Sequence, residues 1–121
     1  MAAPVLDTNI LIDWLCDRPG ASNELARYPS HRISRLSWVE VLAGEPPERR
    51  PHVIDLLEFF EIIEVDARIA LAGAAIRHRL RLKLIDALIL ASAQVNDAIL
   101  ITRNTKDFPA NMLGIRVPYT L

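Results

Sequence analysis

The stretch Val5-Leu-Asp-Thr-Asn-Ile-Leu-Ile12 contains the pattern on which the fold prediction rests. Its apolar beginning predicts a short buried strand over 4–7, and the helical spacing of Ile10, Leu11 and Trp14 predicts a helix over 9–16. Asp7 therefore lies where a buried strand ends and a helix begins. An acid flanked by apolar residues either caps the helix or is paired with another charge or a cation, because burying it alone is costly.

The same alternation of strand and helix continues along the chain. Further strands are predicted at 32–34, 62–65, 98–102 and 114–117, and further helices at 21–27, 37–43, 48–60, 67–80 and 85–95, with Asp66 as the cap of the helix over 67–80. This alternation indicates an α/β fold in which helices cover both faces of a central parallel sheet. The functional side chains of such folds lie beyond the carboxyl ends of the strands, which here means after Asp7, near Ser37 and after Thr102.

The composition supports one globular domain spanning residues 1–121. Its 51% hydrophobic and 24% charged residues exclude a disordered chain. No apolar run approaches the roughly 18–20 residues of a membrane span, and the start, Met1-Ala-Ala-Pro4, lacks the features of a signal peptide. The single cysteine, Cys16, cannot form an internal disulfide, so we expect a cytoplasmic location. The net charge is −1, so binding to nucleic acid would require a local basic patch.

Three acids stand at places where both a local and a functional explanation apply. Asp7 could simply cap the following helix. Ser37-x-x-Glu40 matches a capping box, which is the explanation that local evidence favours for Glu40. Asp86 fits the first turn of a helix, but that helix is almost entirely apolar, so we expect it to be buried with Asp86 facing inward.

Two further candidates, Asn104 and Asp107, lie in Thr102-Arg-Asn-Thr-Lys-Asp-Phe108, directly after the clearest strand. Asn and Asp also suit an ordinary turn. The combination is more informative than any one residue, because these groups should converge with Asp7 and Asp86. Carboxylates about 4 Å apart repel by several kcal/mol at an effective dielectric near 20, and a divalent cation removes that repulsion. Oxygen ligands favour Mg²⁺ or Mn²⁺ over Zn²⁺.

At this point the sequence resembles the PIN-domain ribonucleases, and among them the VapC toxins of bacterial and archaeal toxin–antitoxin pairs. The resemblance runs from Leu6 to Tyr119, and it is carried by Leu6-Asp-Thr-Asn-Ile-Leu-Ile-Asp13, Ser37-x-x-Glu40 with Gly44, Asp86-Ala-Leu-Ile-Leu-Ala91, Leu100-Ile-Thr-Arg-Asn-Thr-Lys-Asp-Phe108 and Gly114-Ile-Arg-Val-Pro-Tyr119. It implies a three-layer α/β/α fold, a site for Mg²⁺ or Mn²⁺, and endonucleolytic cleavage of tRNA or rRNA. It also implies a VapB-type antitoxin that blocks the site, with toxin–antitoxin hetero-oligomers.

Carried over to this chain, the resemblance assigns the central acids to Asp7, Glu40 and Asp86. The family's fourth acid falls at Asn104, a departure that removes one negative charge and that Asp107 could compensate, directly or through water. The implied mechanism is metal-assisted in-line displacement, with the metal on Asp7 and Asp86 and with Glu40 positioning it or accepting a proton from water. The products would carry 5′-phosphate and 3′-hydroxyl ends. Asn9 and Thr102 are expected to orient the carboxylates.

Two surface features have alternative explanations. The segment Arg77-His-Arg-Leu-Arg-Leu-Lys83 either contacts the RNA backbone through Arg77, Arg79, Arg81 and Lys83 or is a solvated helix end. A surplus of large apolar residues is assigned by default to the core, although part of it could form a homodimer contact or a groove for an antitoxin helix; this surplus comprises Trp14, Leu15, Leu36, Trp38, Leu42, Leu56, Leu57, Phe59 and Phe60.

The sequence can also be compared with what three other classes of protein require. A response-regulator receiver domain would need an acid adjacent to Asp7 and an acid at the end of a central strand, whereas Asp55 lies in an amphipathic helix. A haloacid-dehalogenase-like phosphatase would need Asp at position 9, which is Asn9. The remaining alternative is a PIN-like module that has lost catalysis and only binds, an interpretation that Asn104 keeps open.

Overall fold

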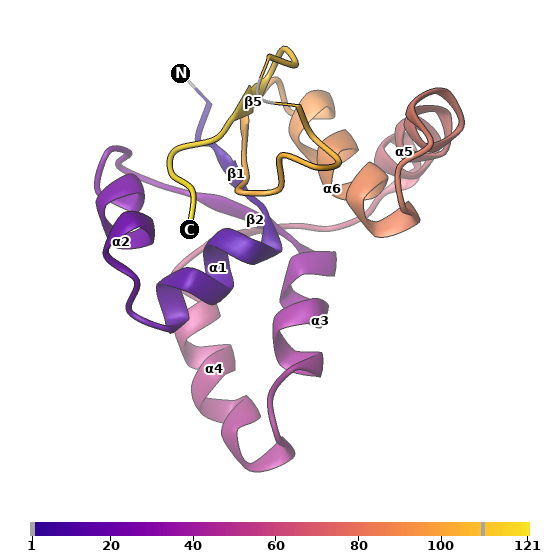
Figure 1. Cartoon of the computed structure of the whole chain (residues 1–121). Coiled ribbons are helices and arrows are strands. Elements are labelled where there is room, and N and C mark those ends of the chain that lie inside the picture. The colour runs from indigo at the N-terminus through magenta and orange to yellow at the C-terminus, as the bar shows by residue number, and fades with distance from the viewer. Residues whose placement is uncertain (1, 110) are drawn as a thin grey trace.

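A parallel sheet of five short strands forms the middle layer of the protein (Figure 1). The computed structural model describes residues 2–109 and 111–121. The strand order is β3-β2-β1-β4-β5, where the strands are β1 (Val5–Leu6), β2 (Arg32–Ser34), β3 (Glu61–Ile63), β4 (Leu100–Ile101) and β5 (Ile115–Arg116). Val5 pairs with Arg32 on one side and with Leu100 on the other, so β1 is the central strand.

Helices cover both faces of this sheet. They are α1 (Thr8–Leu15), α2 (Pro19–Leu25), α3 (Arg35–Ala43), the 3₁₀ turn η1 (Pro47–Arg49), α4 (Arg50–Leu57), α5 (Ala67–Leu80) and α6 (Leu84–Val95). The longest of them, α5, has 14 residues, and no helix of the described residues is long and apolar enough to span a membrane.

Alternation of side chains along the strands separates two cores. Val5 of β1 and Leu100 of β4 pack with α5 and α6. Their neighbours Leu6 and Ile101 face the other side of the sheet and pack with α1, α3 and α4. Successive residues of a strand point to opposite faces, so each central strand stabilises both layers. This confirms the predicted three-layer α/β/α architecture with a parallel sheet.

Most predicted elements are present, and the corrections concern their ends. The predicted helix over 48–60 is two elements, η1 and α4, and it ends at Leu57. The helix predicted over 37–43 begins at Arg35 instead, and Ser34 is its N-cap, accepting a hydrogen bond from the backbone N–H of Leu36. The capping-box interpretation of Ser37-x-x-Glu40 is therefore wrong. Asp66 does cap α5, as predicted, by accepting from the backbone N–H of Ile69.

The apolar surplus belongs mostly to the core. Leu42, Leu57 and Phe60 are buried, whereas Trp14, Leu15, Leu36, Trp38 and Leu56 are half-buried. Only Phe59 of this set is largely exposed, at 69%. Its ring still stacks on Trp14 at a centroid distance of 6.2 Å, which makes it the rim of an aromatic cluster.

Candidate active site

The carboxyl ends of β1 and β4 place Asp7 and Thr102 side by side. These strands are neighbours in the sheet, and each of the two residues directly follows its strand. The Thr102 hydroxyl donates to Oδ2 of Asp7 at 2.7 Å, and the backbone N–H of Thr8 donates to Oδ1 at 2.7 Å. Asp7 is the N-cap of α1, which confirms the local explanation for it, whereas its functional role stays a prediction.

Burial makes the Asp7 carboxyl group unusual. Removal from water raises its pKa to about 6 from the ordinary value of 3.8, although hydrogen bonds from Thr102 and Thr8 partly oppose this effect. The negative charges of Asp86 and Glu40 also contribute to this raised value. Three acids, one directly after β1, one on α3 and one on α6, are thus close together.

Glu40 reaches this edge of the sheet because α3 begins directly after β2. Its Oε1 accepts a hydrogen bond from the Thr8 hydroxyl at 2.6 Å, and the hydroxyl of Ser37 lies 3.0 Å from that of Thr8. Ser37 and Glu40 therefore form hydrogen bonds with Thr8, the residue after Asp7, and do not cap their own helix α3. The Glu40 carboxylate remains exposed to solvent.

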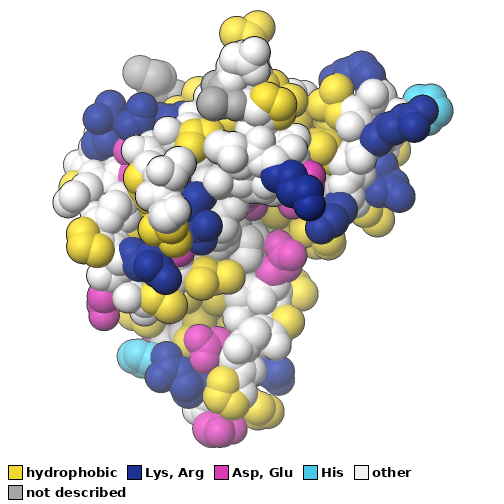
Figure 2. All heavy atoms as spheres, in the orientation of Figure 1, with side chains coloured by type: hydrophobic (Ala, Val, Ile, Leu, Met, Phe, Trp, Pro, Cys, Tyr) yellow, Lys and Arg dark blue, Asp and Glu magenta, His cyan; other side chains and the backbone are white. Residues whose placement is uncertain are grey.

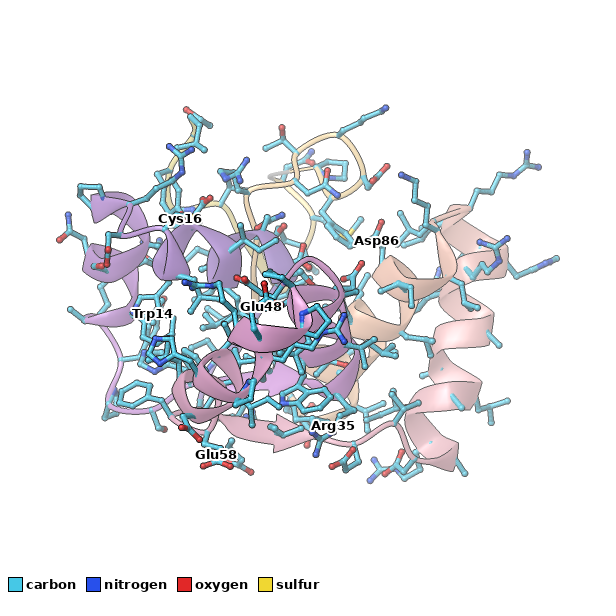
Figure 3. All side chains as sticks on the ribbon, turned by 90° about the horizontal axis from the view of Figure 1, so that it is seen from below. Trp14, Cys16, Arg35, Glu48, Glu58 and Asp86 are labelled. Carbon is cyan, nitrogen blue, oxygen red and sulfur yellow. The ribbon has the colours of Figure 1, made fainter. Side chains whose placement is uncertain are left out.

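Asp86 stands in the first turn of α6 and is half-buried (Figure 3). Burial raises the pKa of its carboxyl group, and the charges of Asp107 and Glu40 add to this increase, whereas the nearby Lys83 ammonium opposes it. The prediction that α6 is largely buried holds for its residues from Ala87 to Ala93, apart from half-buried Leu88.

The loop after β4 is a closed turn built around Asn104. The Asn104 side-chain amide donates to Oδ2 of Asp107 at 3.0 Å, and its Oδ1 accepts from the backbone N–H of Asp107 at 3.2 Å. The backbone N–H of Asn104 donates to the Thr102 hydroxyl at 3.0 Å. The neutral Asn104 therefore orients the carboxylate of Asp107, which is one of the two acids that raise the pKa of Asp86.

The predicted basic segment borders these acids. Figure 2 shows Lys and Arg side chains beside the acidic centre of this face, over the ends of α5 and α6. Arg77 donates to the backbone carbonyl of Leu82 at 2.8 Å, and Arg81 adopts a left-handed conformation with φ of 57° where α5 ends. An open hollow of about 550 Å³ lies here, lined partly by Arg77, His78 and Arg81. Arg79, Arg81 and Lys83 are exposed to solvent.

Asn9 completes the hydrogen-bonded group around Asp7. Its side-chain amide lies 3.3 Å from Oδ2 of Asp7 and 3.3 Å from the Thr102 hydroxyl. Both residues predicted to orient carboxylates, Asn9 and Thr102, thus contact Asp7 in the structure.

Sequence reasoning missed one acid close to this group, Asp13 of α1. It is only 2% exposed and accepts hydrogen bonds from Arg103 and Tyr119. A signal was available, because Asp13 follows Ile10, Leu11 and Ile12 and is followed by Trp14 and Leu15. An acid inside such an apolar helix needs a partner if it is buried.

The donor set fits a divalent cation that also binds a phosphate group. Among residues 2–109 and 111–121, no three His, Cys, Asp or Glu side chains form a group that could hold a metal ion by themselves. Mg²⁺ does not require such a cage, because proteins usually bind it through one or two carboxylates together with substrate phosphates. Asp7 and Asp86 provide two carboxylates, each with a pKa raised by burial and by neighbouring negative charge.

An α/β/α layer structure with one acid directly after β1, one on α3 and one in the first turn of α6 agrees with what the resemblance to PIN domains predicts. The PIN domain family model matches residues 5–110, and the chain belongs to this family. A comparison with curated protein sequences found no significant match.

The chain is also similar to chains in solved structures. A toxin–antitoxin complex from Klebsiella pneumoniae contains a chain that is 40% identical, with a TM-score of 0.92 and coverage of 98% of this chain and 100% of that one. VapBC2 from Rickettsia felis, bound to a DNA fragment from its promoter, is 24% identical, with a TM-score of 0.78 and coverage of 95% and 96%. DNA-bound VapBC from Salmonella typhimurium is 24% identical, with a TM-score of 0.79 and coverage of 96% of each chain. The last two likenesses concern the fold alone.

Proposed function

We propose that this chain is the toxin of a VapBC-type pair and acts as a metal-dependent endoribonuclease. Membership of the PIN domain family supports the nuclease activity. The similarity to the Klebsiella pneumoniae chain, which extends over the whole of that chain, supports the toxin assignment. The cytoplasm, where its RNA substrates are found, is the proposed location.

The observation that carries this proposal is the convergence of Asp7, Glu40 and Asp86 at one edge of the sheet, where the charges of the other two raise the pKa of Asp7. Its pKa of about 6 reflects a carboxylate that is buried beside two other acids. The pKa of Asp86 is raised by burial and by the charges of Asp107 and Glu40. Stability alone would favour replacing such a group of carboxylates, so a cation-dependent reaction is the explanation that accounts for them.

Asp7 and Asp86 are the residues that would hold Mg²⁺ or Mn²⁺, with Glu40 and Asp107 at the rim. When bound, the cation would supply positive charge to neutralise the carboxylates and the phosphate. Thr102, Asn9 and the backbone N–H of Thr8 orient Asp7.

Glu40 is the proposed proton acceptor. The Thr8 hydroxyl donates to its Oε1, which fixes the carboxylate while leaving Oε2 to accept a proton from water. The water oxygen forms the new bond to phosphorus, the bond from phosphorus to the 3′ oxygen breaks, and the leaving oxygen takes a proton from solvent. The products are a 5′-phosphate and a 3′-hydroxyl.

We propose that RNA approaches along the basic segment at the end of α5. Arg79, Arg81 and Lys83 are exposed, and Lys83 is close enough to lower the pKa of Asp86. The guanidinium of Arg77 donates to the Leu82 carbonyl, so we propose that its main contribution is to hold the turn that presents Arg81 and Lys83.

An antitoxin encoded with the chain is the proposed partner, and blocking of the acidic site is its proposed action. The Klebsiella pneumoniae relative was solved as a toxin–antitoxin complex, which supports this pairing. We also propose homodimers of the toxin within toxin–antitoxin hetero-oligomers. The exposed Phe59 at the rim of the aromatic cluster is a candidate contact for either assembly.

A catalytically inactive binding module is the competing function, and Asn104 is the residue that would favour it. The hydrogen bond from Asn104 to Asp107 argues against this alternative. Asn104 itself is neutral, but it holds the negatively charged carboxylate of Asp107 beside the site.

The test is an assay of RNA cleavage by the purified chain. Total tRNA and rRNA are incubated with Mg²⁺, with Mn²⁺ and with EDTA, and Asp7→Ala serves as the inactive variant. We expect discrete fragments with both metals and none with EDTA or in the variant. A folded, antitoxin-free protein that leaves every RNA intact would contradict the proposed function.

A further inference from the structure

Asp13 is a buried carboxylate that the proposed reaction does not use. Arg103 donates to it through two nitrogens, from Nε to Oδ2 at 2.7 Å and from Nη2 to Oδ1 at 3.1 Å. The Tyr119 hydroxyl donates to Oδ2 at 2.8 Å. Burial alone would raise the pKa of Asp13, but these hydrogen bonds outweigh burial and lower it. The carboxylate is therefore ionised and paired at neutral pH.

Arg103 occupies the position between two residues of the acidic site. On one side is Thr102, whose hydroxyl donates to Asp7, and on the other is Asn104, whose amide donates to Asp107. The backbone N–H of Arg103 donates to Oδ1 of Asn9 at 3.1 Å. Asn9 and Asp13 lie one turn apart on α1, so Arg103 is bound to that helix through both its backbone and its side chain.

The bond to the Arg103 backbone also determines which way the Asn9 amide faces. Because Oδ1 accepts from Arg103, Nδ2 must face Asp7 and Thr102, where it lies 3.3 Å from each oxygen. A flipped amide would put two donors against each other and would remove the donor from Asp7. The orientation of Asn9 thus depends on where the Arg103 backbone is held.

We propose that Asp13 and Arg103 form a positioning pair for the acidic site. The pair holds the chain at 102–104 against α1, and through Asn9, Thr102 and Asn104 it fixes the carboxylates of Asp7 and Asp107. Neither member contacts the substrate. The kinetic part of this inference rests on the proposed function, because it is measured as RNA cleavage.

The chain contains a matched control cluster with the same chemistry. Glu24 of α2 is 4% exposed and accepts from Nε of Arg116 at 2.5 Å, from its Nη2 at 2.9 Å and from the Tyr28 hydroxyl at 3.1 Å. Each cluster therefore joins a buried carboxylate to a two-pronged arginine and a tyrosine. Arg116 accepts a hydrogen bond from the backbone N–H of Thr102 through its backbone carbonyl, which a side-chain substitution leaves in place. In the part of the chain that the structure describes, the side chains of the control cluster form no hydrogen bond with Asn9 or with the loop over 102–107.

The kinetic experiment compares Asp13→Asn and Arg103→Lys with Glu24→Gln and Arg116→Lys. We expect the first two to lower kcat by about tenfold to a hundredfold, as is usual for residues that orient metal-site carboxylates, with KM for RNA unchanged. The double variant should be no slower than the slower single one, because both remove the same support. The control variants should lower the melting temperature to a similar degree while kcat stays near the wild-type value.

Two kinetic outcomes would overturn the proposal. A raised KM with unchanged kcat in Arg103→Lys would make Arg103 an RNA contact. An equal loss of kcat in the control variants would show that any damage to a buried ion pair slows the enzyme.

A spectroscopic experiment tests the same pair without any activity. The side-chain amide signals of Asn9 are assigned in ¹⁵N-labelled protein and compared between Arg103→Lys and Arg116→Lys. We expect them to shift in the first variant alone, and unchanged signals in Arg103→Lys would refute the positioning role. If the wild-type chain cleaves no RNA, the proposed function fails while this measurement still decides the inference.

Discussion

Asp7 uses its two carboxylate oxygens for different purposes. Oδ1 accepts from the backbone N–H of Thr8 and so satisfies one of the free donors at the start of α1. Oδ2 accepts from the Thr102 hydroxyl and belongs to the site. One residue can therefore both cap a helix and present a carboxylate oxygen to the candidate site, so the two explanations for Asp7 do not exclude each other.

The raised pKa of Asp7 predicts a pH dependence of stability. Its pKa of about 6 in the folded protein exceeds the ordinary value of 3.8, so the folded state holds the proton more tightly than the unfolded state. Stability should therefore fall as pH rises from about 4 to 6, by at most about 3 kcal/mol from this group. Asp7→Asn removes this contribution.

Urea unfolding in EDTA, repeated between pH 4 and pH 7.5, measures this effect. The variant should gain stability relative to wild type as the pH rises, and most of the gain should be complete above pH 6. A difference between the two proteins that does not change with pH would contradict the assignment.

Asp86 is predicted to be required for cleavage but not for folding. Its pKa is raised by burial and by the charges of Asp107 and Glu40, so the folded protein gains little from the negative charge itself. Asp86→Asn should therefore abolish metal-dependent cleavage while the melting temperature stays within a few degrees of wild type. Asp55→Asn on α4, an exposed acid, is the control and should remain active. Full activity of Asp86→Asn would exclude Asp86 from the metal site.

At the scale of elements, the limits of helices are decided by contacts that local sequence does not contain. Strand β2 was predicted at its observed residues, and Asp66 was correctly identified as the cap of α5. For α3, however, Ser34 and Ser37 are both good N-cap residues, one turn apart. The contact of Ser37 with Thr8, which lies 29 residues away in the chain, leaves Ser34 as the cap.

The close packing of α5 on α6 predicts the effect of a side chain at Gly73. A Cβ atom at this position would lie 2.4 Å from Cδ2 of Leu88, so the helices approach each other over a residue without a side chain. Gly73→Val should therefore destabilise the fold by about 1–3 kcal/mol through overpacking.

The control for this prediction is Ala75→Val on the exposed side of the same helix. Both variants introduce the same β-branched side chain into α5, so a difference between them reports the contact with α6. Equal midpoints in chemical denaturation would contradict the close approach.

At the scale of the whole molecule, the strand order explains why the site exists and why part of it could not be predicted. Alternating elements indicated a parallel sheet, but only the observed order makes β1 and β4 neighbours and so joins Asp7 to Thr102. Asp7 and Asp86 could be proposed from local pattern because one follows a strand and the other begins a helix, whereas Glu40 was proposed only through the family resemblance. Asp13 was missed because its partner Arg103 is 90 residues away, and no local pattern links them.

The distribution of charge over the molecule leads to the last prediction. The net charge of −1 gives no overall attraction to RNA, and the acidic site itself repels phosphate. Binding must then depend on the basic residues beside the site, of which Arg79 and Arg81 are exposed at the end of α5. Arg81 has a φ of 57°, so glycine can replace it without backbone strain.

The combined variant Arg79→Ala with Arg81→Gly should weaken RNA binding and reduce its dependence on salt. Each phosphate contact on single-stranded RNA contributes about 0.7 to the slope of log K against log salt, so losing two contacts should reduce the slope by about 1.4. The measurement is made in the Asp86→Asn background, which is expected to bind without cleaving. The control is a second double variant, in which Arg27 and Arg68 are replaced instead. These two residues are exposed at the end of α2 and near the start of α5. If the control variant reduces the slope as much as the Arg79 and Arg81 variant does, the attraction to RNA is a property of total charge. If neither variant reduces the slope, the end of α5 is a solvated helix end and RNA binds elsewhere on the protein.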